Sequence, residues 1–161
     1  MKELLEKISS YNIFNYLFPG VLFAVIGSEI SNYSFIQQNI VIGSFVYYFI
    51  GLVISRIGSL IIEPILKKTN FVKFADYKDY VLASQKDSKI EVLSEANNMF
   101  RTLISVFLSL ALLFLYSIIE LKFPILKKWN IILSIIALLI LFLFSYRKQI
   151  NYITYRIKSN K

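Results

Sequence analysis

The sequence predicts an all-α membrane protein with four transmembrane helices, both termini in the cytoplasm, and a short cytoplasmic helical hairpin between the second and third helices. Three observations support this fold class. The chain of 161 residues is 57% apolar and 17% charged, whereas soluble domains are about 45–50% apolar and about 25% charged. Its mean hydropathy is +0.61. Four apolar stretches approach the roughly 20 residues that cross a bilayer as a helix.

The first span is expected at residues 11–27. Lys2 and Lys7 precede it as in a signal peptide, but no small-x-small cleavage pattern follows Gly27, so we expect a retained helix. The pair Pro19–Gly20 inside this span predicts either a kink or the N-terminal boundary of the helix.

The second span is expected at residues 40–60, with an apolar run that continues to Leu66. Three small residues follow one another at intervals of four positions, the pattern through which membrane helices approach closely: Gly51, Ser55 and Ser59. Pro64 predicts that the helix ends or kinks there.

The third span is expected at residues 102–119 and the fourth at residues 130–146. The third span is apolar except for a narrow polar stripe that includes Ser105, Ser109 and Tyr116. This stripe and the small residues of the second span have two interpretations: packing within one four-helix bundle, or the lining of a central pore in a homo-oligomer. The fourth span is almost wholly Ile, Leu and Phe, and we expect it to face lipid.

The distribution of basic residues predicts the orientation in the membrane. Of the 18 Lys and Arg residues, three lie between the third and fourth spans: Lys122, Lys127 and Lys128. The others lie before the first span, between Arg56 and Arg101, or after the fourth span. The positive-inside rule therefore predicts cytoplasmic termini and a cytoplasmic middle segment in the bacterial inner membrane.

The middle segment, residues 67–101, is predicted to form a helical hairpin. Phe71, Phe74, Val81 and Leu82 suggest a first helical stripe, and the spacing from Ser88 to Glu91 is that of a capping box at the start of the second arm. The absence of Gly and Pro from Lys89 to Ile119 predicts one helix of about 30 residues that continues into the third span. The hairpin either folds back on the helix ends or acts as a sensor coupled to the third span.

Arg56 and Glu63 lie seven positions apart on one face of the second helix, near its cytoplasmic end. Ionisable residues inside a membrane are costly and are candidates for function. Two interpretations are open: a structural ion pair with Asn97, Asn98 or Arg101 at the same depth, or a gate or ligand-contact ring around an oligomer axis.

The C-terminal residues 147–161 form a basic amphipathic tail whose charged residues include Arg147, Lys148, Arg156 and Lys158. Such a tail is typical of a segment that lies on anionic lipid headgroups. The competing interpretation is an anionic ligand such as a nucleotide or oligonucleotide, with Tyr152 and Tyr155 stacking on bases.

The absence of cysteine and histidine excludes thiolate nucleophiles, Cys/His zinc sites and His-based acid–base catalysis. The remaining carboxylates between the second and third spans resemble a solvated helical face: Asp76, Asp79, Asp87, Glu91 and Glu95. We therefore predict no catalytic residue, no metal site and no cofactor. A transporter would need charges near the midplane and an internal repeat, and neither is visible.

Three features define the layout: the start at Asn15-Tyr16-Leu17-Phe18-Pro19-Gly20, the four spans, and the cytoplasmic helix that ends at Asn97-Asn98-Met99-Phe100-Arg101-Thr102. In this layout the chain resembles small multi-pass membrane effectors of bacterial antiphage defence, with the oligonucleotide-gated channel effector of the Hailong type as the closest case. The resemblance implies an oligomeric effector with a basic cytoplasmic ligand site. It covers the whole chain in layout and carries over no ligand residues.

The leading functional hypothesis is therefore a homo-oligomeric membrane channel gated by a cytoplasmic ligand or a partner protein. The small cytoplasmic mass implies that the input comes from another molecule. The alternative is a non-conducting membrane anchor that recruits a soluble enzyme or sensor through residues 67–101.

Overall fold

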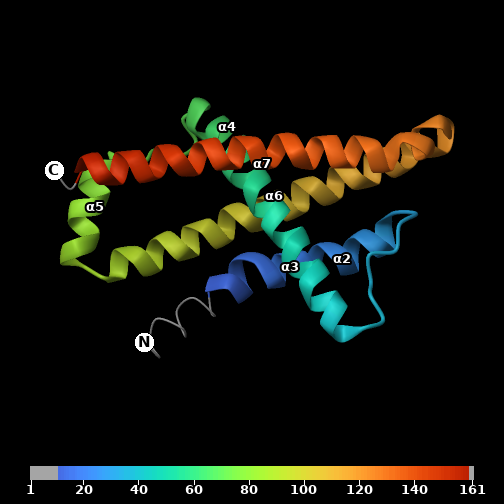
Figure 1. Ribbon diagram of the computed structural model, residues 1–161, viewed down its shortest axis with the longest axis horizontal. Coiled ribbons are helices and arrows are strands. Elements are labelled where there is room, and N and C mark those ends of the chain that lie inside the picture. The colour runs from blue at the N-terminus through green and yellow to red at the C-terminus, as the bar shows by residue number, and fades with distance from the viewer. Residues whose placement is uncertain (1–10, 160–161) are drawn as a thin grey trace.

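The computed structural model describes residues 11–159, which are wholly helical apart from short connections (Figure 1). The first long helix consists of a π-helical and an α-helical part, η1 (Ile13–Leu17) and α2 (Phe18–Ile30). The second long helix has three consecutive parts: α3 (Ile40–Ile57), η2 (Gly58–Ile62) and α4 (Glu63–Lys68). Then follow the short α5 (Tyr77–Lys86) and the long α6 (Lys89–Lys122) and α7 (Ile125–Ser159). Lys2, Lys7 and the last two residues of the predicted tail lie outside the described residues.

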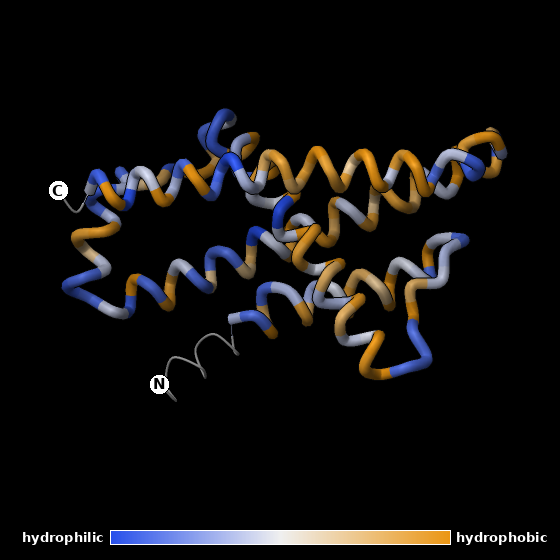
Figure 2. Tube along the Cα trace, in the orientation of Figure 1, coloured by the Kyte–Doolittle hydropathy of each residue, from blue (hydrophilic) through white to orange (hydrophobic). Residues whose placement is uncertain are grey.

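Within residues 11–159, four helices are long and apolar enough to cross a membrane: Ile13–Ile30, Ile40–Lys68, Lys89–Lys122 and Ile125–Ser159. This confirms the predicted all-α fold with four transmembrane segments. Figure 2 shows the apolar residues concentrated along α7 and the adjoining half of α6, and polar residues toward α5. Only 6% of the most apolar stretch of α7 is buried, against 33% for the first helix. The outer surface of α7 is therefore the most lipid-like face of the described chain.

The first two helices cross in direct backbone contact. A Cβ atom on Gly20 would lie 1.7 Å from the carbonyl oxygen of Tyr47, and one on Gly51 would lie 1.8 Å from that of Tyr16. No side chain fits at either position. Membrane helices associate through such close approaches because lipid provides little hydrophobic drive between them.

A turn of π-helix precedes both Pro19 and Pro64, and the helix continues through each proline. The predicted helix boundary at Pro19–Gly20 and the predicted helix end at Pro64 are therefore wrong. In an α-helix the proline ring clashes with the carbonyl four residues earlier. Here the Phe18 N–H donates to the Ile13 carbonyl and the Glu63 N–H to the Gly58 carbonyl, both five residues back. The wider turn relieves the clash and keeps the helix intact.

The connection between the second and third long helices is less helical than predicted. Phe71 and Phe74 lie in an extended loop, where they are 79% and 52% exposed, so the helical stripe predicted from Phe71 is wrong. Val81 of α5 is buried. In Figure 1, α6 and α7 diverge from their turn, and α5 lies between their far ends and contacts both.

The start of α6 also differs from the prediction. The Ser88 side chain makes no capping hydrogen bond, and the Lys89 N–H donates instead to the Asp87 carboxylate at 2.9 Å. The predicted capping box is therefore wrong, because the preceding aspartate supplies the acceptor. The predicted continuity of the second arm with the third span is confirmed, since α6 runs unbroken over 34 residues. Likewise α7 continues unbroken to Ser159, so the predicted tail is the end of the fourth helix.

Candidate functional site

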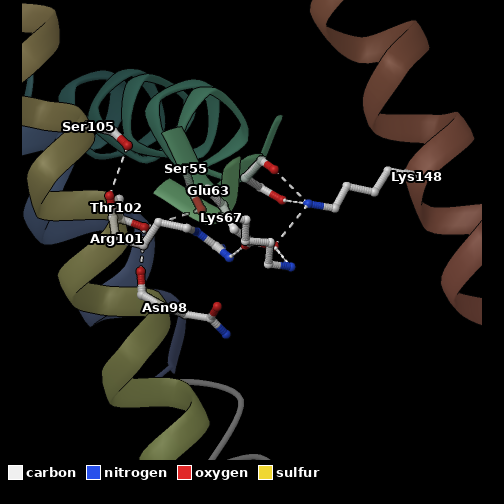
Figure 3. A network of polar contacts seen from close by, with 9 residues as sticks. Ser55, Glu63, Lys67, Asn98, Arg101, Thr102, Ser105 and Lys148 are labelled. Carbon is white, nitrogen blue, oxygen red and sulfur yellow. Dashed lines mark hydrogen bonds and ion pairs between the residues drawn. The ribbon is translucent and has the colours of Figure 1, made fainter. Parts of the chain in front are cut away.

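Glu63, the first residue of α4, lies at the centre of an ion cluster that joins three helices (Figure 3). Its carboxylate accepts from Arg101 Nη1 of α6 at 2.6 Å and from Lys67 Nζ of α4 at 2.9 Å. Lys148 Nζ of α7 lies 3.8 Å from the same carboxylate. The Glu63 side chain is only 8% exposed. We call these four residues the Glu63 cluster.

Lys148 reaches this cluster because Pro64 leaves a backbone carbonyl without its helical partner. The Glu63 N–H is bonded to Gly58, and Pro64 has no N–H, so the Ser59 carbonyl finds no donor four or five residues later. Lys148 Nζ donates to this carbonyl at 2.6 Å and to the Ser59 hydroxyl at 2.7 Å. Lys148 was predicted to lie in a tail that contacts lipid headgroups or an anionic ligand, whereas its ammonium group points into the bundle and donates to Ser59.

Three members of the Glu63 cluster, Glu63, Lys67 and Arg101, line a cavity of about 620 Å³ between the helix ends and α5, which we call the Glu63 cavity. All five predicted gate or ligand residues line it: Arg56, Glu63, Asn97, Asn98 and Arg101. The structure thus brings together residues from α3, α4 and α6. Tyr152, predicted as a residue that stacks on the bases of an anionic ligand, also lines it. No prediction from the sequence covered other residues that complete the lining, which include Tyr11, Tyr77, Tyr80 and Gln149.

The lining of the Glu63 cavity favours an anion. Its charged residues are three cations and two carboxylates: Arg56, Lys67, Arg101, Glu63 and Asp76. Arg56 is paired with no carboxylate among the described residues, and donates to the Tyr16 hydroxyl at 3.3 Å. Within residues 11–159, the buried Nε of Arg101 has no hydrogen-bond partner. Of the two interpretations of Glu63, the structure contains the ion pair with Arg101.

Some of the predicted small and polar residues of the second and third spans contact one another within one chain, whereas Gly51 contacts the first helix and Ser59 contacts α7. Thr102 donates to the Ser55 hydroxyl at 3.4 Å, and the Ser105 hydroxyl donates to the Arg101 carbonyl at 2.9 Å. A Cβ atom on Gly58 would lie 2.5 Å from the Ser105 hydroxyl. Ser55, Ser59 and Ser105 are buried and Ser109 is half-buried.

A second polar cluster lies at the opposite end of the bundle, and sequence reasoning missed it. Tyr33 donates to the Glu120 carboxylate at 2.5 Å, and the Asn130 amide donates to both, at 2.6 and 2.8 Å. Tyr116, predicted as a packing or pore residue, donates to the Asn130 carbonyl oxygen. We call these residues the Tyr33 cluster. The available signal was the spacing of four positions between Tyr116 and Glu120, which places both on one face of α6.

The Tyr33 cluster changes the pKa of Tyr33, which lies in the loop between α2 and α3. Partial burial of the phenol, followed by its hydrogen bond to the negatively charged Glu120, raises the pKa of Tyr33 to about 12. The phenol therefore stays protonated and remains a hydrogen-bond donor at neutral pH. Glu120 thus has a neutral partner, unlike Glu63.

The other predicted tail residues are exposed: Arg147, Arg156 and Lys158. In the described part of the chain, no group of three or more His, Cys, Asp or Glu residues is arranged to hold a metal ion. Comparison of the chain with protein-family models, with curated proteins and with solved structures finds no match. Any proposal about function therefore rests on the geometry of the chain itself.

Proposed function

We propose that this protein is a homo-oligomeric membrane channel effector that opens when an anionic cytoplasmic ligand binds in the Glu63 cavity. One observation carries the proposal: a single carboxylate at the wall of an open cavity neutralises cations of three helices. An incoming anion competes with Glu63 for Lys67 and Arg101, the two of these cations that line the cavity. Ligand binding is thereby linked to the contacts that hold the helices together.

Displacement of Glu63 by an anion would be transmitted to the membrane-spanning helices through Arg101 and Lys148. Arginine binds phosphate and carboxylate groups through paired, charge-assisted hydrogen bonds, and Arg101 retains an unpaired Nε. Arg101 belongs to the unbroken α6, so a shift at this residue is transmitted along a rigid helix into the apolar region. Lys148 transmits the same event to α7.

The structure corresponds in this proposal to the closed state. The polar face of α6 packs against the second long helix, Thr102 against Ser55 of α3 and Ser105 against Gly58 of η2. Movement of α6 and α7 would open this face to water in the assembled oligomer. The layout resemblance to small effectors of antiphage defence extends the proposal to a defence role in the bacterial inner membrane, with both termini cytoplasmic.

Glu63→Gln tests the gating step, because it keeps the shape of the side chain and removes the charge that an anion would displace. In proteoliposomes we expect the ion flux of this variant to exceed that of the unmodified protein about tenfold, as for a loss of about 1.4 kcal/mol from the closed state. Glu29→Gln is the matched control, since Glu29 is exposed on α2 and lies outside the cluster. Equal flux in both variants, or a monomeric particle in images of nanodiscs, would contradict the proposal.

Pyrophosphate, a small multivalent anion, tests the binding step separately. Calorimetric titration should show binding that Arg101→Gln weakens about tenfold, while Lys158→Gln on the exposed end of α7 leaves it unchanged. If both variants bind alike, the cavity is not the anion site.

The membrane-anchor alternative is favoured by a different observation. The connection and the first turns of α6 expose apolar side chains: Phe71 is 79% exposed, Leu93 68% and Val92 60%. Exposed apolar patches commonly mark surfaces for protein partners. The anchor hypothesis predicts no ion flux in any variant, and loss of a co-purifying soluble protein when Leu93 is replaced by lysine.

A further inference from the structure

Two polar attachments join the fourth long helix to the rest of the bundle. Asn130 joins the Tyr33 cluster and Lys148 joins the Ser59 carbonyl and Glu63. These two residues are 18 positions apart, which is about 27 Å along a helix. The hydrocarbon core of a bilayer is about 30 Å thick. The two polar attachments are thus separated by about one hydrocarbon thickness.

Between these attachments α7 contacts α3 directly, and two cavities lie beside this contact. One cavity of about 460 Å³ lies between α7 and α6 near Asn130, and another of about 660 Å³ lies between α7 and the helix formed by α3 and η2. Both cavities include Ala137 in their lining. Direct packing in this region includes the rings of Phe49 and Phe142, whose centroids are 6.1 Å apart. We call the larger cavity the α3–α7 groove.

The α3–α7 groove has an apolar lining and opens sideways. Its walls are made of aliphatic and phenylalanine side chains: Val53, Ile57, Leu60, Ile61, Ala137, Leu138, Ile140, Leu141 and Phe144. Ile61 and Phe144 are 49% and 54% exposed. A water molecule needs two or more polar partners, which these side chains do not supply. The groove therefore suits an apolar occupant that enters from the surrounding lipid.

Size and charge identify that occupant. The groove extends about 10 Å along α7, so 660 Å³ corresponds to a section of about 60 Å², below the roughly 80 Å² of a whole helix. Flexible acyl chains fit without displacing α7. Lys148 lies one helical turn beyond Phe144, the last residue of α7 that lines the groove. An ammonium group has three N–H donors, and Ser59 accepts two of them. Lys148 Nζ also lies 3.8 Å from Glu63 Oε1, beyond hydrogen-bond distance, and the lysine side chain is 26% exposed, so its third N–H can reach a phosphate.

We propose that the α3–α7 groove binds an anionic phospholipid, with its acyl chains between α3 and α7 and its phosphate at Lys148. The acyl chains of the lipid fill the α3–α7 groove, and its phosphate places an anion beside the ammonium group of Lys148. This site is distinct from the Glu63 cavity, and the proposal holds whether or not the chain conducts ions.

Native mass spectrometry of the full chain, released from detergent micelles, tests the acyl-chain site. Leu141→Trp places a large ring in the groove, whereas Leu139→Trp places the same ring on the 60% exposed face of α7. We expect phosphatidylglycerol to remain bound to the unmodified protein and to Leu139→Trp, and to fall at least tenfold in Leu141→Trp. Equal retention in the two variants would overturn the proposal. A smaller oligomer mass in Leu141→Trp, with unchanged lipid, would assign the groove to a second copy of the chain.

A second measurement keeps the proposal testable if Leu141→Trp does not fold. Phosphatidylglycerol with a photoreactive acyl chain should crosslink the unmodified protein at residues 53–61 and 137–144, and crosslinking confined to other surfaces would count against the groove.

A third measurement tests the headgroup contact. The unmodified protein should retain phosphatidylglycerol at least fivefold better than phosphatidylcholine. Lys148→Gln should abolish this preference, and Arg147→Gln, on the neighbouring exposed residue, should keep it. Equal retention of both lipids by the unmodified protein would refute the phosphate contact.

Discussion

The Glu63 and Tyr33 clusters hold α7 at opposite ends, and they differ in chemistry. In the Glu63 cluster one carboxylate faces three cations beside a cavity of about 620 Å³. In the Tyr33 cluster the Glu120 carboxylate accepts from a phenol and an amide. Another anion can displace a carboxylate from cations, but it has less to gain from neutral donors. The difference suggests that the α5 end of α7 moves, and that the opposite end serves as a pivot.

Glu63→Ala should have the largest effect on this comparison. It leaves Lys67, Arg101 and Lys148 without their shared anion, and breaking a buried pair in this way costs about 3 kcal/mol. The free energy of unfolding in mixed detergent micelles should fall by that amount, and the deficit should shrink as added salt screens the repulsion. Glu91→Ala on the exposed face of α6 should change it little. An equal decrease in the free energy of unfolding in the two variants would mean that the Glu63 cluster does not stabilise the fold.

Asn130→Ala should have the next largest effect, at the opposite end. The amide exchanges hydrogen bonds with Tyr33, Glu120 and Tyr116, and leaving such buried groups unpaired costs about 2 kcal/mol. The same unfolding measurement should show this loss with much weaker salt dependence than for Glu63→Ala. Ser134→Ala, one turn further along α7, is the control because its side chain is exposed. A strong salt dependence of Asn130→Ala would erase the distinction between the two ends.

The smallest expected effect is a pH dependence confined to the Tyr33 cluster. Tyr33 has an ordinary pKa of 10.0 in the unfolded chain and one of about 12 in the folded chain. The folded state therefore keeps a proton that the unfolded state releases, so the contribution to stability is complete below pH 10 and is lost between about pH 10 and pH 12. Ultraviolet absorbance should record a phenol that titrates near pH 12 in the unmodified protein and is missing in Tyr33→Phe. Titration of that phenol near pH 10 would show that Glu120 does not hold it.

Several features of the site follow from local sequence signals. Glu63 near the end of the second span and Arg101 near the start of the third were expected at one depth, because consecutive membrane helices are antiparallel, and the structure pairs them at 2.6 Å. The Tyr33 cluster had no comparable signal, since Tyr33 lies in the connection between α2 and α3, Glu120 near the end of α6 and Asn130 near the start of α7. Phe71 and Phe74 matched a helical period, yet both lie in a loop.

Hydropathy and the spacing of charges were sufficient to predict the four spans and the unbroken α6, because transfer of a segment into lipid depends chiefly on its own composition and length. Tertiary structure alone decided that Lys148 enters the Glu63 cluster. That contact depends on a π turn before Pro64, on a carbonyl that loses its helical donor, and on a lysine 89 positions away that can reach it. Buried polar groups must find a partner wherever the fold supplies one, and the identity of that partner depends on the three-dimensional arrangement of the helices.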